Sequence, residues 1–475
     1  MDTTSTASSS TDAPGPDDRQ PTEGSPPTPT TGSPAPTHDP ERRAFFRLFG
    51  RQAAQTVAQV AGVASAVSQM PVNALTGLVE LTSPQPASPL PASRPAATLA
   101  TDAPYRSPYR VTDDAIHLLD QRKLPDASDE QLCRRGSDVA YYFRVGAARG
   151  GPLMAQLAAY GLAFSARDLR DRSPDARRAE LRRVGRALVQ ARTGSRMLRW
   201  AVDRVWALAD ALPEETDGAT VAGLLRSDAD ARAADADLDH AVIARSLEEV
   251  LPRPDGRTLE VLIHGDPGAL SAGLVGPALT ALSNRIAAGG QVRAWVTESR
   301  PGMEGARLAS WELANLDVDH QVLPDAAVGA LLEREQVDAV LLAGDWIAAN
   351  GDVGGLVGSR IVAGMAATAG RGPVPVFIAA PIATFDPATP DGAAIPVEER
   401  PGRDLQTHVT GTRLPRARGW NRGNDVVPAG WVHRIVTEMG VFEPADATGL
   451  GAALDGREAR RPIDLPATVA AGGVA

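Results

Sequence analysis

The sequence predicts an α/β protein in which a mostly helical region precedes a parallel sheet that helices cover on both faces. Between residues 113 and 252 the apolar residues recur at helical spacing, as in GPLMAQLAAYGLAF and SRMLRWAVDRVWALADAL. From Thr258 onward, short β-rich apolar runs alternate with helical segments, which is typical of a parallel sheet with crossover helices. A chain of 475 residues is long enough to build both parts.

The N-terminal region divides into a tail, a helical segment and a linker. Residues 1–40 contain no Val, Ile, Leu, Phe, Tyr or Trp, so they cannot bury enough apolar surface to become ordered. Residues 41–82 show helical periodicity, and the Pro- and Ala-rich residues 83–110 predict a linker. We therefore expect a disordered tail at 1–40, a helical domain at 111–255, a sheet domain at 256–445 and a loose tail at 446–475.

The segment 41–82 mixes arginines and phenylalanines in ERRAFFRLFGR and allows three interpretations. The first is a helix that packs on its own domain or docks on a partner protein. The second is an amphipathic helix at a membrane surface, formed by residues 41–70, and the third is a twin-arginine export signal. Gln52, Gln55 and Gln59 make the apolar run too weak to span a bilayer, and Arg51 interrupts the start of an export signal's apolar region.

Composition excludes several classes of function. The net charge of −10 argues against a general affinity for nucleic acid, which requires a basic surface. The single cysteine, Cys133, is expected to pack within a helical stretch, and it cannot form an internal disulfide, which fits a cytoplasmic protein. Because Lys123 is the only lysine, any bound phosphate must be held by arginines, backbone N–H groups and helix N-termini. No cofactor or metal is expected.

Polar residues follow five predicted strands, LEVLI, VRAWV, HQVL, DAVLLA and VPVFIAA. In an open α/β sheet, ligands bind beyond the carboxyl ends of the parallel strands. This rule places six polar side chains around one crevice, namely His264, Asp266, Glu298, Arg300, Asp325 and Asp345.

Several longer motifs occur in a fixed order along the chain: LDQRKLP, RGGPLMAQLAAYGLA, ESRPGMEGARLASWEL, GDWIAANGD and TFDPATPDGAAIPVEER. Together they resemble the methylthioribose-1-phosphate isomerases and, more broadly, a superfamily with ribose-1,5-bisphosphate isomerase and the regulatory subunits of translation initiation factor 2B. The resemblance continues through DVVPAGWVHRIVTEMGVFEP and covers roughly two thirds of the chain. It implies a helical N-terminal domain, a Rossmann-like C-terminal domain, an active site between them and a homodimer.

The resemblance also implies a reaction, the conversion of a phosphorylated aldose into the ketose by an aspartate and a cysteine. The aspartate matches Asp345, whose pKa we expect partial burial and carboxylates such as Asp352 to raise. The structural alternative for Asp345 is an N-cap of the following turn. Gly265 stands at the cysteine position and has no reactive side chain, and the neighbouring Asp266 is a candidate substitute acid. His264 is interpreted as a hydrogen-bonded residue at a strand end.

Arg149, Gly150 and Gly151 match the family's phosphate-gripping arginine and helix start, and Arg192 matches a second arginine in its helix. The structural alternative for each arginine is a surface salt bridge. These matches imply a phosphorylated sugar or a nucleotide as the ligand.

Four other positions depart from the family pattern. Glu304 replaces a glutamine, and Gly355 and Leu356 replace an asparagine and a lysine that hold the substrate. Glu304 would repel phosphate, while Leu356 would add an apolar wall. Trp346 replaces an arginine after Asp345 and is expected to narrow the pocket or stack on a ring.

Three hypotheses about function follow. The first is an aldose–ketose isomerase of a phosphorylated pentose that lacks the family cysteine. The second is a non-catalytic, metabolite-binding, regulatory or scaffold paralogue that resembles the initiation factor 2B subunits. The third is an isomerase whose changed pocket selects a less anionic sugar.

Overall fold

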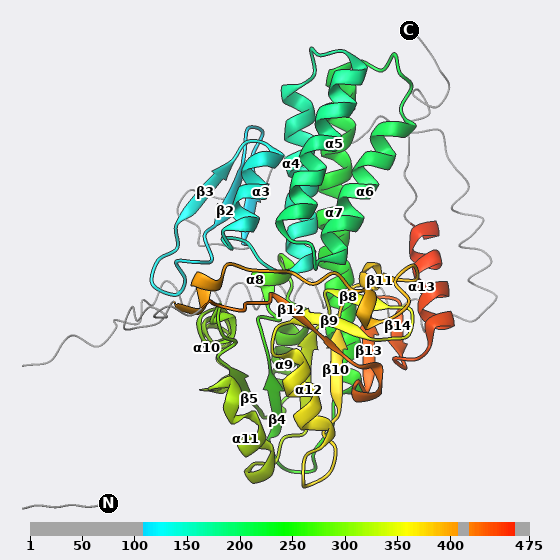
Figure 1. The fold of residues 1–475 in the computed structure, drawn as a ribbon. Helices are drawn as coiled ribbons and strands as arrows, with labels where there is room; N and C mark the ends of the chain where they lie inside the picture. Colours follow the sequence, from blue (N-terminus) through cyan, green and yellow to red (C-terminus); the bar gives the residue numbers. More distant parts are fainter. Residues whose placement is uncertain (1–107, 407–417, 461–475) are drawn as a thin grey trace, which may run out of the picture. The chain divides into compact units, whose positions relative to one another are not determined.

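The structure is a computed structural model that describes residues 108–406 and 418–460 (Figure 1). The predicted tail at 1–40, the amphipathic segment at 41–82 and most of the linker at 83–110 lie outside these residues. The C-terminal prediction is wrong in part, because residues Ala447–Arg460 form helix α13 where a loose tail was expected. Leu450 of this helix is fully buried, which explains why the segment is ordered.

A three-stranded antiparallel sheet begins the described chain. Its strands, in spatial order, are β1 (Tyr109–Val111), β2 (Ile116–Leu119) and β3 (Glu130–Cys133). Cys133 was expected in a helix but ends β3, where it pairs with Ile116. Its side chain is fully buried, and burial raises the pKa of the thiol to about 12. The thiol is therefore protonated and inert, as the packing interpretation predicted.

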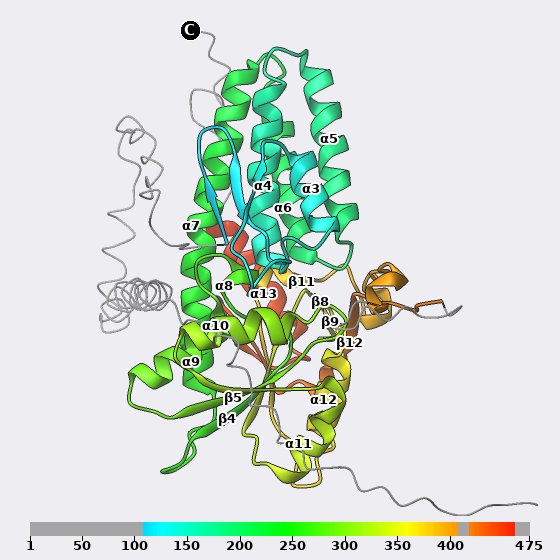
Figure 2. The ribbon, with the colours of Figure 1, turned by 90° about the vertical axis from the view of Figure 1, so that its left-hand side faces the viewer.

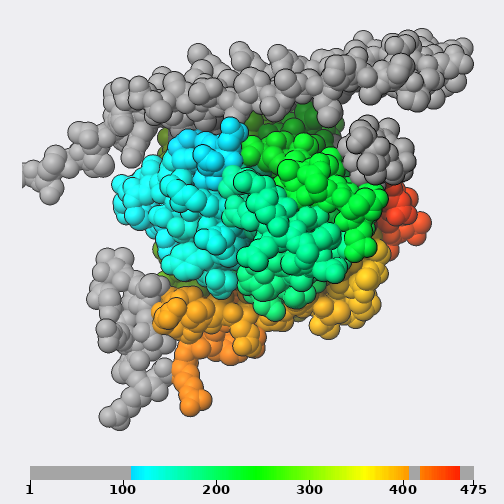
Figure 3. All heavy atoms as spheres, turned by 90° about the horizontal axis from the view of Figure 1, so that it is seen from above, coloured from blue at the N-terminus to red at the C-terminus, as the bar shows by residue number. Residues whose placement is uncertain are grey.

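Five helices follow this small sheet and pack on one another (Figure 1). Seen from above, the atoms of the small sheet and of these helices, coloured from cyan to green, form one continuous surface (Figure 3). They are α3 (Gly136–Arg144), α4 (Gly151–Asp168), α5 (Pro174–Ala191), α6 (Arg196–Ala211) and α7 (Gly218–Val250). Helix α4 is buried along most of its length, so it forms the centre of this part. Ser195 accepts the Leu198 N–H to cap α6, and Asp217 accepts two amide protons to cap α7. No helix in the described ranges has the length and apolarity needed to cross a bilayer.

A seven-stranded sheet forms the second part. Its spatial order is β14-β13-β10-β7-β4-β5-β6, and all neighbours pair in parallel except β13 and β14. All five strands expected from the sequence are present. The strands are β4 (Leu259–Ile263), β5 (Val292–Thr297), β6 (Asp319–Leu323), β7 (Ala339–Ala343), β10 (Val376–Ala379), β13 (Arg434–Thr437) and β14 (Gly440–Phe442).

The order of the strands determines where a ligand would bind. The chain runs outward from β4 to β6 and then returns to β7 on the other side of β4. The order therefore reverses between β4 and β7, and a crevice is expected at the carboxyl ends of these two strands. Both Gly265 and Asp345 lie just beyond these ends.

Helices cover both faces of this sheet, because the strands point apolar side chains to each face. Val261 and Ile263 pack with the C-terminal half of α7 and with α9 on one face, whereas Leu262 packs with α11 and α12 on the other. Helix α7 thus continues from the helical part onto the sheet (Figure 2). The α-helices between β4 and β10 are α8 (Ala269–Ala272), α9 (Pro277–Ala287), α10 (Ser310–Asn315), α11 (Val328–Arg334) and α12 (Ser359–Ala367).

A four-stranded sheet follows directly from β7. Its spatial order is β11-β8-β9-β12, from β8 (Trp346–Ala348), β9 (Val353–Leu356), β11 (Phe385–Asp386) and β12 (Asn424–Val427). Asp345 lies between β7 and β8, directly before the first residue of β8. The junction of the two sheets therefore fixes its position.

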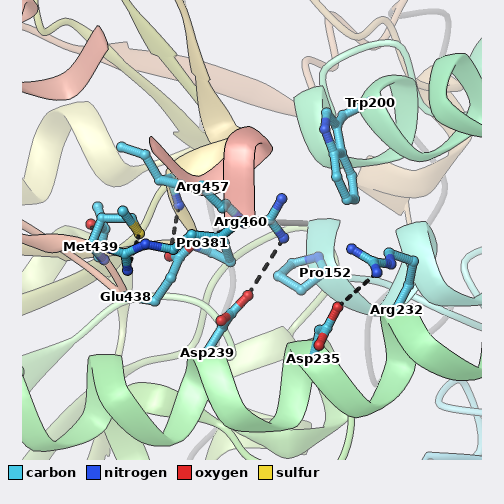
Figure 4. A network of polar contacts seen from close by, with 12 residues as sticks. Pro152, Trp200, Arg232, Asp235, Asp239, Pro381, Glu438, Met439, Arg457 and Arg460 are labelled. Atoms are coloured by element: carbon cyan, nitrogen blue, oxygen red, sulfur yellow. Dashed lines mark hydrogen bonds and ion pairs between the residues drawn. The ribbon is translucent and has the colours of Figure 1, made fainter. Parts of the chain in front are cut away.

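Helix α13 is attached by Arg457, which lies close to the carboxylates of Asp239 and Glu438 (Figure 4). Its guanidinium is 3.5 Å from Asp239 of α7 and 3.0 Å from Glu438 after β13, and it lies 4.8 Å above the Trp200 ring of α6. The side chains of Arg457, Asp239 and Glu438 are only 6%, 7% and 4% exposed. A single buried cation therefore joins α13 to both parts of the fold.

Replacing Arg457 by methionine should destabilise the protein, because two buried acidic groups would lose their cation. We expect the free energy of unfolding to fall by about 3–5 kcal/mol, measured by urea titration. Arg460→Met on the same helix is the matched control, since Arg460 is exposed and should change the value by less than about 0.5 kcal/mol. Equal, small effects of the two variants would contradict the assignment.

Candidate functional site

The site forms where the N-terminus of α4 meets the carboxyl end of β7. The Asp345 amide donates to the Gly354 carbonyl (2.8 Å), and the Asp345 carbonyl accepts from the Arg196 amide (3.0 Å). A Cβ on Gly151 would lie 3.2 Å from Asp345 Oδ1, so the carboxylate faces the first turn of α4. Asp345 is thereby held by the small sheet, by α6 and by α4.

The Asp345 carboxyl group has a perturbed pKa. Burial raises this pKa to about 6, and the nearby Glu398 carboxylate adds to the effect, while Arg192 and Arg400 oppose it. Asp352, which we expected to contribute, instead accepts the amides of Gly392 (3.0 Å) and Ala429 (2.9 Å). The N-cap interpretation of Asp345 is also wrong, because strand β8 follows it and not a helix.

Glu398 joins two arginines beside Asp345. Its Oε1 lies 3.0 Å from Arg192 Nε and 2.9 Å from Arg400 Nε, and all three side chains are 13–14% exposed. Arg192 lies immediately after α5, not inside it as the resemblance implied. Burial lowers the pKa of Arg400 to about 10, so this guanidinium remains charged at neutral pH. Its Nη2 is buried and has no hydrogen-bond partner, which leaves a donor for a ligand.

Glu398 and Arg400 were not among the predicted site residues. Both belong to the motif IPVEER, which the resemblance included without assigning roles to single residues. The available signal was a pair of opposite charges after the buried Ile395. Their partner Arg192 is 206 positions away in sequence from Glu398, so local pattern could not connect them.

Arg149 and Glu304 form a direct ion pair, in which Arg149 Nη1 donates to Glu304 Oε1. Glu304 is 5% exposed. Although burial raises the pKa of Glu304, the opposing effects of Arg149, Arg400 and Arg192 are larger and hold this pKa below its usual value. Glu304 is therefore ionised, and the Arg149 pair is not a surface salt bridge.

Backbone geometry explains the glycines at the start of α4 and in the small sheet. Gly150 has φ of 90°, and a Cβ there would lie 2.1 Å from the Ser271 carbonyl oxygen. A Cβ on Gly355 would lie 3.1 Å from Ser359 Oγ. Both positions therefore require a close approach that a larger side chain would disturb.

Gly265 lies in a backbone turn that comes close to the Leu356 side chain. Its φ is 87°, and its amide donates to Ser299 Oγ at 3.0 Å. A Cβ added here would lie 3.3 Å from Leu356 Cδ2. The position at which the resembled enzymes carry a cysteine is thus a backbone turn without a side chain. Leu356 lies beside this turn as the predicted apolar wall.

His264 is a buried, uncharged residue with both ring nitrogens engaged. Nδ1 lies 2.7 Å from Thr297 Oγ1 and Nε2 lies 3.0 Å from the Val357 carbonyl oxygen, which makes Nε2 the donor. Burial lowers the pKa of His264. The interpretation of His264 as a hydrogen-bonded strand-end residue is confirmed.

Trp346 does not serve as a stacking platform in the crevice. Trp346 is 4% exposed and packs with Ala348 of β8 and with Ile395, which lies between β11 and β12 in the chain. Its indole N–H donates to Thr389 Oγ1 at 3.1 Å. The strand alternation after Asp345 turns Trp346 into the interior, because successive side chains in a strand point to opposite faces.

The remaining predicted residues lie after three strands: Asp266 after β4, Glu298 and Arg300 after β5, and Asp325 after β6. Asp325 accepts the amides of Ser299 (2.8 Å) and Arg300 (2.6 Å), which fixes the turn that begins with Glu298. Ser299 has φ of 59°, and the hydrogen bond from its amide to Asp325 supports this backbone conformation.

Asp266 lies beside another carboxyl group. Burial and the neighbouring Glu312 raise the pKa of Asp266 well above its ordinary value. Glu312 in turn accepts the amides of Ala269 (2.7 Å) and Leu270 (2.8 Å). The pair thus shapes the loop after β4. Across residues 108–406 and 418–460, no three His, Cys, Asp or Glu side chains converge as metal ligands.

Comparison with known proteins gives consistent matches. The model of the initiation factor 2 subunit family matches residues 147–444. Methylthioribose-1-phosphate isomerases from Chloroflexus aurantiacus and Parasynechococcus marenigrum are 34% and 36% identical to this chain, over 70% of it and 94% of each relative.

Solved structures share the fold. The 5-methylthioribose 1-phosphate isomerase from Pyrococcus horikoshii has a TM-score of 0.63 at 23% identity, covering 74% of this chain and 96% of its own. The delta subunit of translation initiation factor eIF-2B from A. fulgidus has a TM-score of 0.59 at 26% identity, covering 74% and 99%. The predicted α/β class, with a sheet of mostly parallel strands, agrees with both.

Substituting Gly265 by alanine should destabilise the protein through both its φ angle and its contact with Leu356. Gly289 has φ of 88° with no atom near its Cβ position, so Gly289→Ala measures the φ effect alone, about 1–2 kcal/mol. We expect Gly265→Ala to cost about 1 kcal/mol more in urea unfolding, and Leu356→Ala to remove that excess. A Gly265→Ala protein as stable as the wild type would contradict this geometry.

Proposed function

The chain belongs to the initiation factor 2 subunit family, and from this membership we propose that it is an aldose–ketose isomerase of a phosphorylated pentose, similar to the methylthioribose-1-phosphate isomerases. The observation that carries the proposal is the position of Asp345. Its carboxylate lies at the point of strand reversal, against the first turn of α4, with a pKa raised to about 6. A group with this pKa can both accept and return a proton near neutral pH.

The proposed reaction moves one hydrogen between neighbouring carbons. In an aldose 1-phosphate, the ring C1–O4 bond breaks and O4 gains a proton, while the Asp345 carboxylate removes the C2 proton to leave an enol phosphate. C1 then receives the proton from Asp345, and the C2 hydroxyl loses its proton to become a carbonyl. The O4 and O2 protons balance, so no redox partner is needed.

The charged neighbours of Asp345 supply the binding part of the proposal. Arg192 and Arg400 lie close enough to lower its pKa, and their positive charges would stabilise the oxygen on which negative charge develops. Arg149 and the amides of Gly150 and Gly151 at the start of α4 would hold the phosphate. The finer assignments that accompany this proposal are a helical domain at 111–255, a Rossmann-like domain at 256–445, a homodimer and a cytoplasmic location.

A second candidate function is a non-catalytic metabolite-binding or regulatory protein, similar in role to subunits of initiation factor 2B. Gly265 favours it, because this position has no side chain that could serve as an acid or base, and Leu356 lies against it. The crevice would then bind a phosphorylated sugar or a nucleotide without converting it. Residues 41–70 are the proposed segment for docking to a partner or a membrane surface.

The pH dependence of turnover tests Asp345. Because burial raises its pKa to about 6, the basic form dominates above that pH and is lost as the pH falls through it. We expect kcat/KM for methylthioribose 1-phosphate or ribose 1,5-bisphosphate to fall about tenfold per unit below this value. A profile flat down to pH 5 would contradict the assignment.

Asp345→Asn should abolish turnover while ligand binding persists. We expect a loss of about 10²–10⁴-fold in kcat, with the thermal stabilisation by ligand retained. The control is Glu399→Gln, which neutralises a carboxylate that is 77% exposed in the same loop as Glu398. Stabilisation of the wild type by a sugar phosphate or nucleotide without any turnover would support the binding protein and overturn the isomerase.

A further inference from the structure

Helix α7 has an exposed apolar face. Ala231, Ala234, Leu238 and Val242 are all exposed, and their spacings of three and four residues place them on one side of the helix. Leu238 and Val242 are 41% and 36% exposed, and neither packs in a hydrophobic cluster of the described residues. Figure 2 shows that α7 runs along one edge of the described chain. This α7 face can therefore receive a further apolar segment.

Carboxylates border the α7 face. The helical repeat places Asp230 on one side of the apolar stripe and Asp235 on the other. Asp230 pairs with Arg226, and Asp235 pairs with Arg232, each at 3.1 Å. The two acidic side chains are 52% and 24% exposed, whereas their arginine partners are 27% and 15% exposed. The carboxylates are thus the outer charges of each pair, and a basic segment would meet them first.

The described chain begins beside the α7 face. The ring of Tyr109, the first residue of β1, has its centroid 6.0 Å from that of Tyr160. The Tyr160 hydroxyl donates to Asp230 at 2.9 Å, and Arg226 Nη1 donates to the Thr112 carbonyl at 3.2 Å. The N-terminal residues 1–107 therefore join the described chain on the Asp230 side of this face.

Residues 41–70, which lie outside the described residues, have a sequence pattern that complements the α7 face. Their helical repeat predicts an apolar stripe with arginines along one side of it. The stripe is Phe46, Phe49, Ala53, Val57 and Val60, and the arginines are Arg43, Arg47 and Arg51. The stripe matches the apolar residues of α7, and the arginines match the bordering carboxylates.

The predicted linker makes such a contact possible although the apolar area is small. A flexible chain of about 25 residues, the length that separates the segment from β1, has an average end-to-end distance of roughly 25–30 Å. The α7 face extends only about 17 Å from Ala231 to Val242. Tethering over such a distance gives an effective concentration on the order of millimolar. A weak apolar contact is therefore sufficient to hold the segment.

We propose that the α7 face is the docking site for residues 41–70 of the same chain, with the phenylalanines over Leu238 and Val242 and the arginines beside the bordering carboxylates. This docking selects the first interpretation of segment 41–82, a helix that packs on its own domain. It competes with docking of residues 41–70 on a partner or a membrane surface. It goes beyond the proposed function and does not depend on isomerase activity.

Thiol labelling of the full-length protein tests the proposal. The native Cys133 is buried with a pKa of about 12, so it contributes no reactive thiol. Ala234→Cys places a thiol on the α7 face, and Ile361→Cys places a control thiol on α12, where Ile361 is 61% exposed. Adding Phe46→Asp and Phe49→Asp should raise the rate of maleimide labelling at position 234 at least about tenfold, because only the undocked fraction reacts. The rate at position 361 should not change.

A change on the helix gives an independent second test. Leu238→Asp should also release the segment and raise the rate at position 234 at least about tenfold. An unchanged rate at position 234 in both sets of variants would overturn the proposal, as expected where the segment binds another protein or a membrane instead. Docking within one chain also requires a rate independent of protein concentration between about 1 and 100 μM. Slower labelling at the higher concentration would assign the face to a second copy of the chain and overturn the proposal, whether or not isomerisation is observed.

Discussion

The close approach of the N-terminus of α4 to the carboxyl end of β7 is the constraint on which the site depends. The start of α4 carries two adjacent glycines, Gly150 where it approaches α8 and Gly151 where it approaches Asp345. A Cβ on Gly150 would collide with the Ser271 carbonyl, and one on Gly151 would press on the Asp345 carboxylate. Because the contact excludes water from Asp345, it also produces the raised pKa of that group. The packing of α4 at the end of β7 and the raised pKa of Asp345 thus have the same cause.

Two carboxylates of the same cluster show how neighbours decide the outcome of burial. Glu304 pairs directly with Arg149, and this attraction together with that of Arg400 and Arg192 outweighs burial, so its pKa falls. Asp345 shares Arg192 and Arg400 with Glu398, which pairs with them directly, so burial prevails and its pKa rises. Groups with opposite shifts in one crevice are suited to different tasks, one as a fixed charge and the other as a proton carrier.

The sequence predicted the parts of this molecule that depend on periodicity and on strand ends. The five strands and the crevice beyond them follow from runs of apolar residues that are bounded by polar ones. The predictions were wrong or incomplete where contacts between residues far apart in the sequence determine the structure. Cys133 pairs with β2, Trp346 turns into the small sheet, and α13 is ordered by packing that the residues 447–460 do not reveal alone. Glu398 was missed because its partner Arg192 lies in another part of the fold.

Gly265 is better described as one part of a rebuilt turn than as a missing side chain. Its φ of 87° is unfavourable for any residue with a Cβ, and the space beyond it holds Leu356. Strand β9, which carries Leu356, is held between β8 and β12 in the small sheet. A thiol at position 265 would therefore need a changed backbone and a changed neighbour together. The crevice is internally consistent without it, and any chemistry it performs must begin from Asp345 and the charges around it.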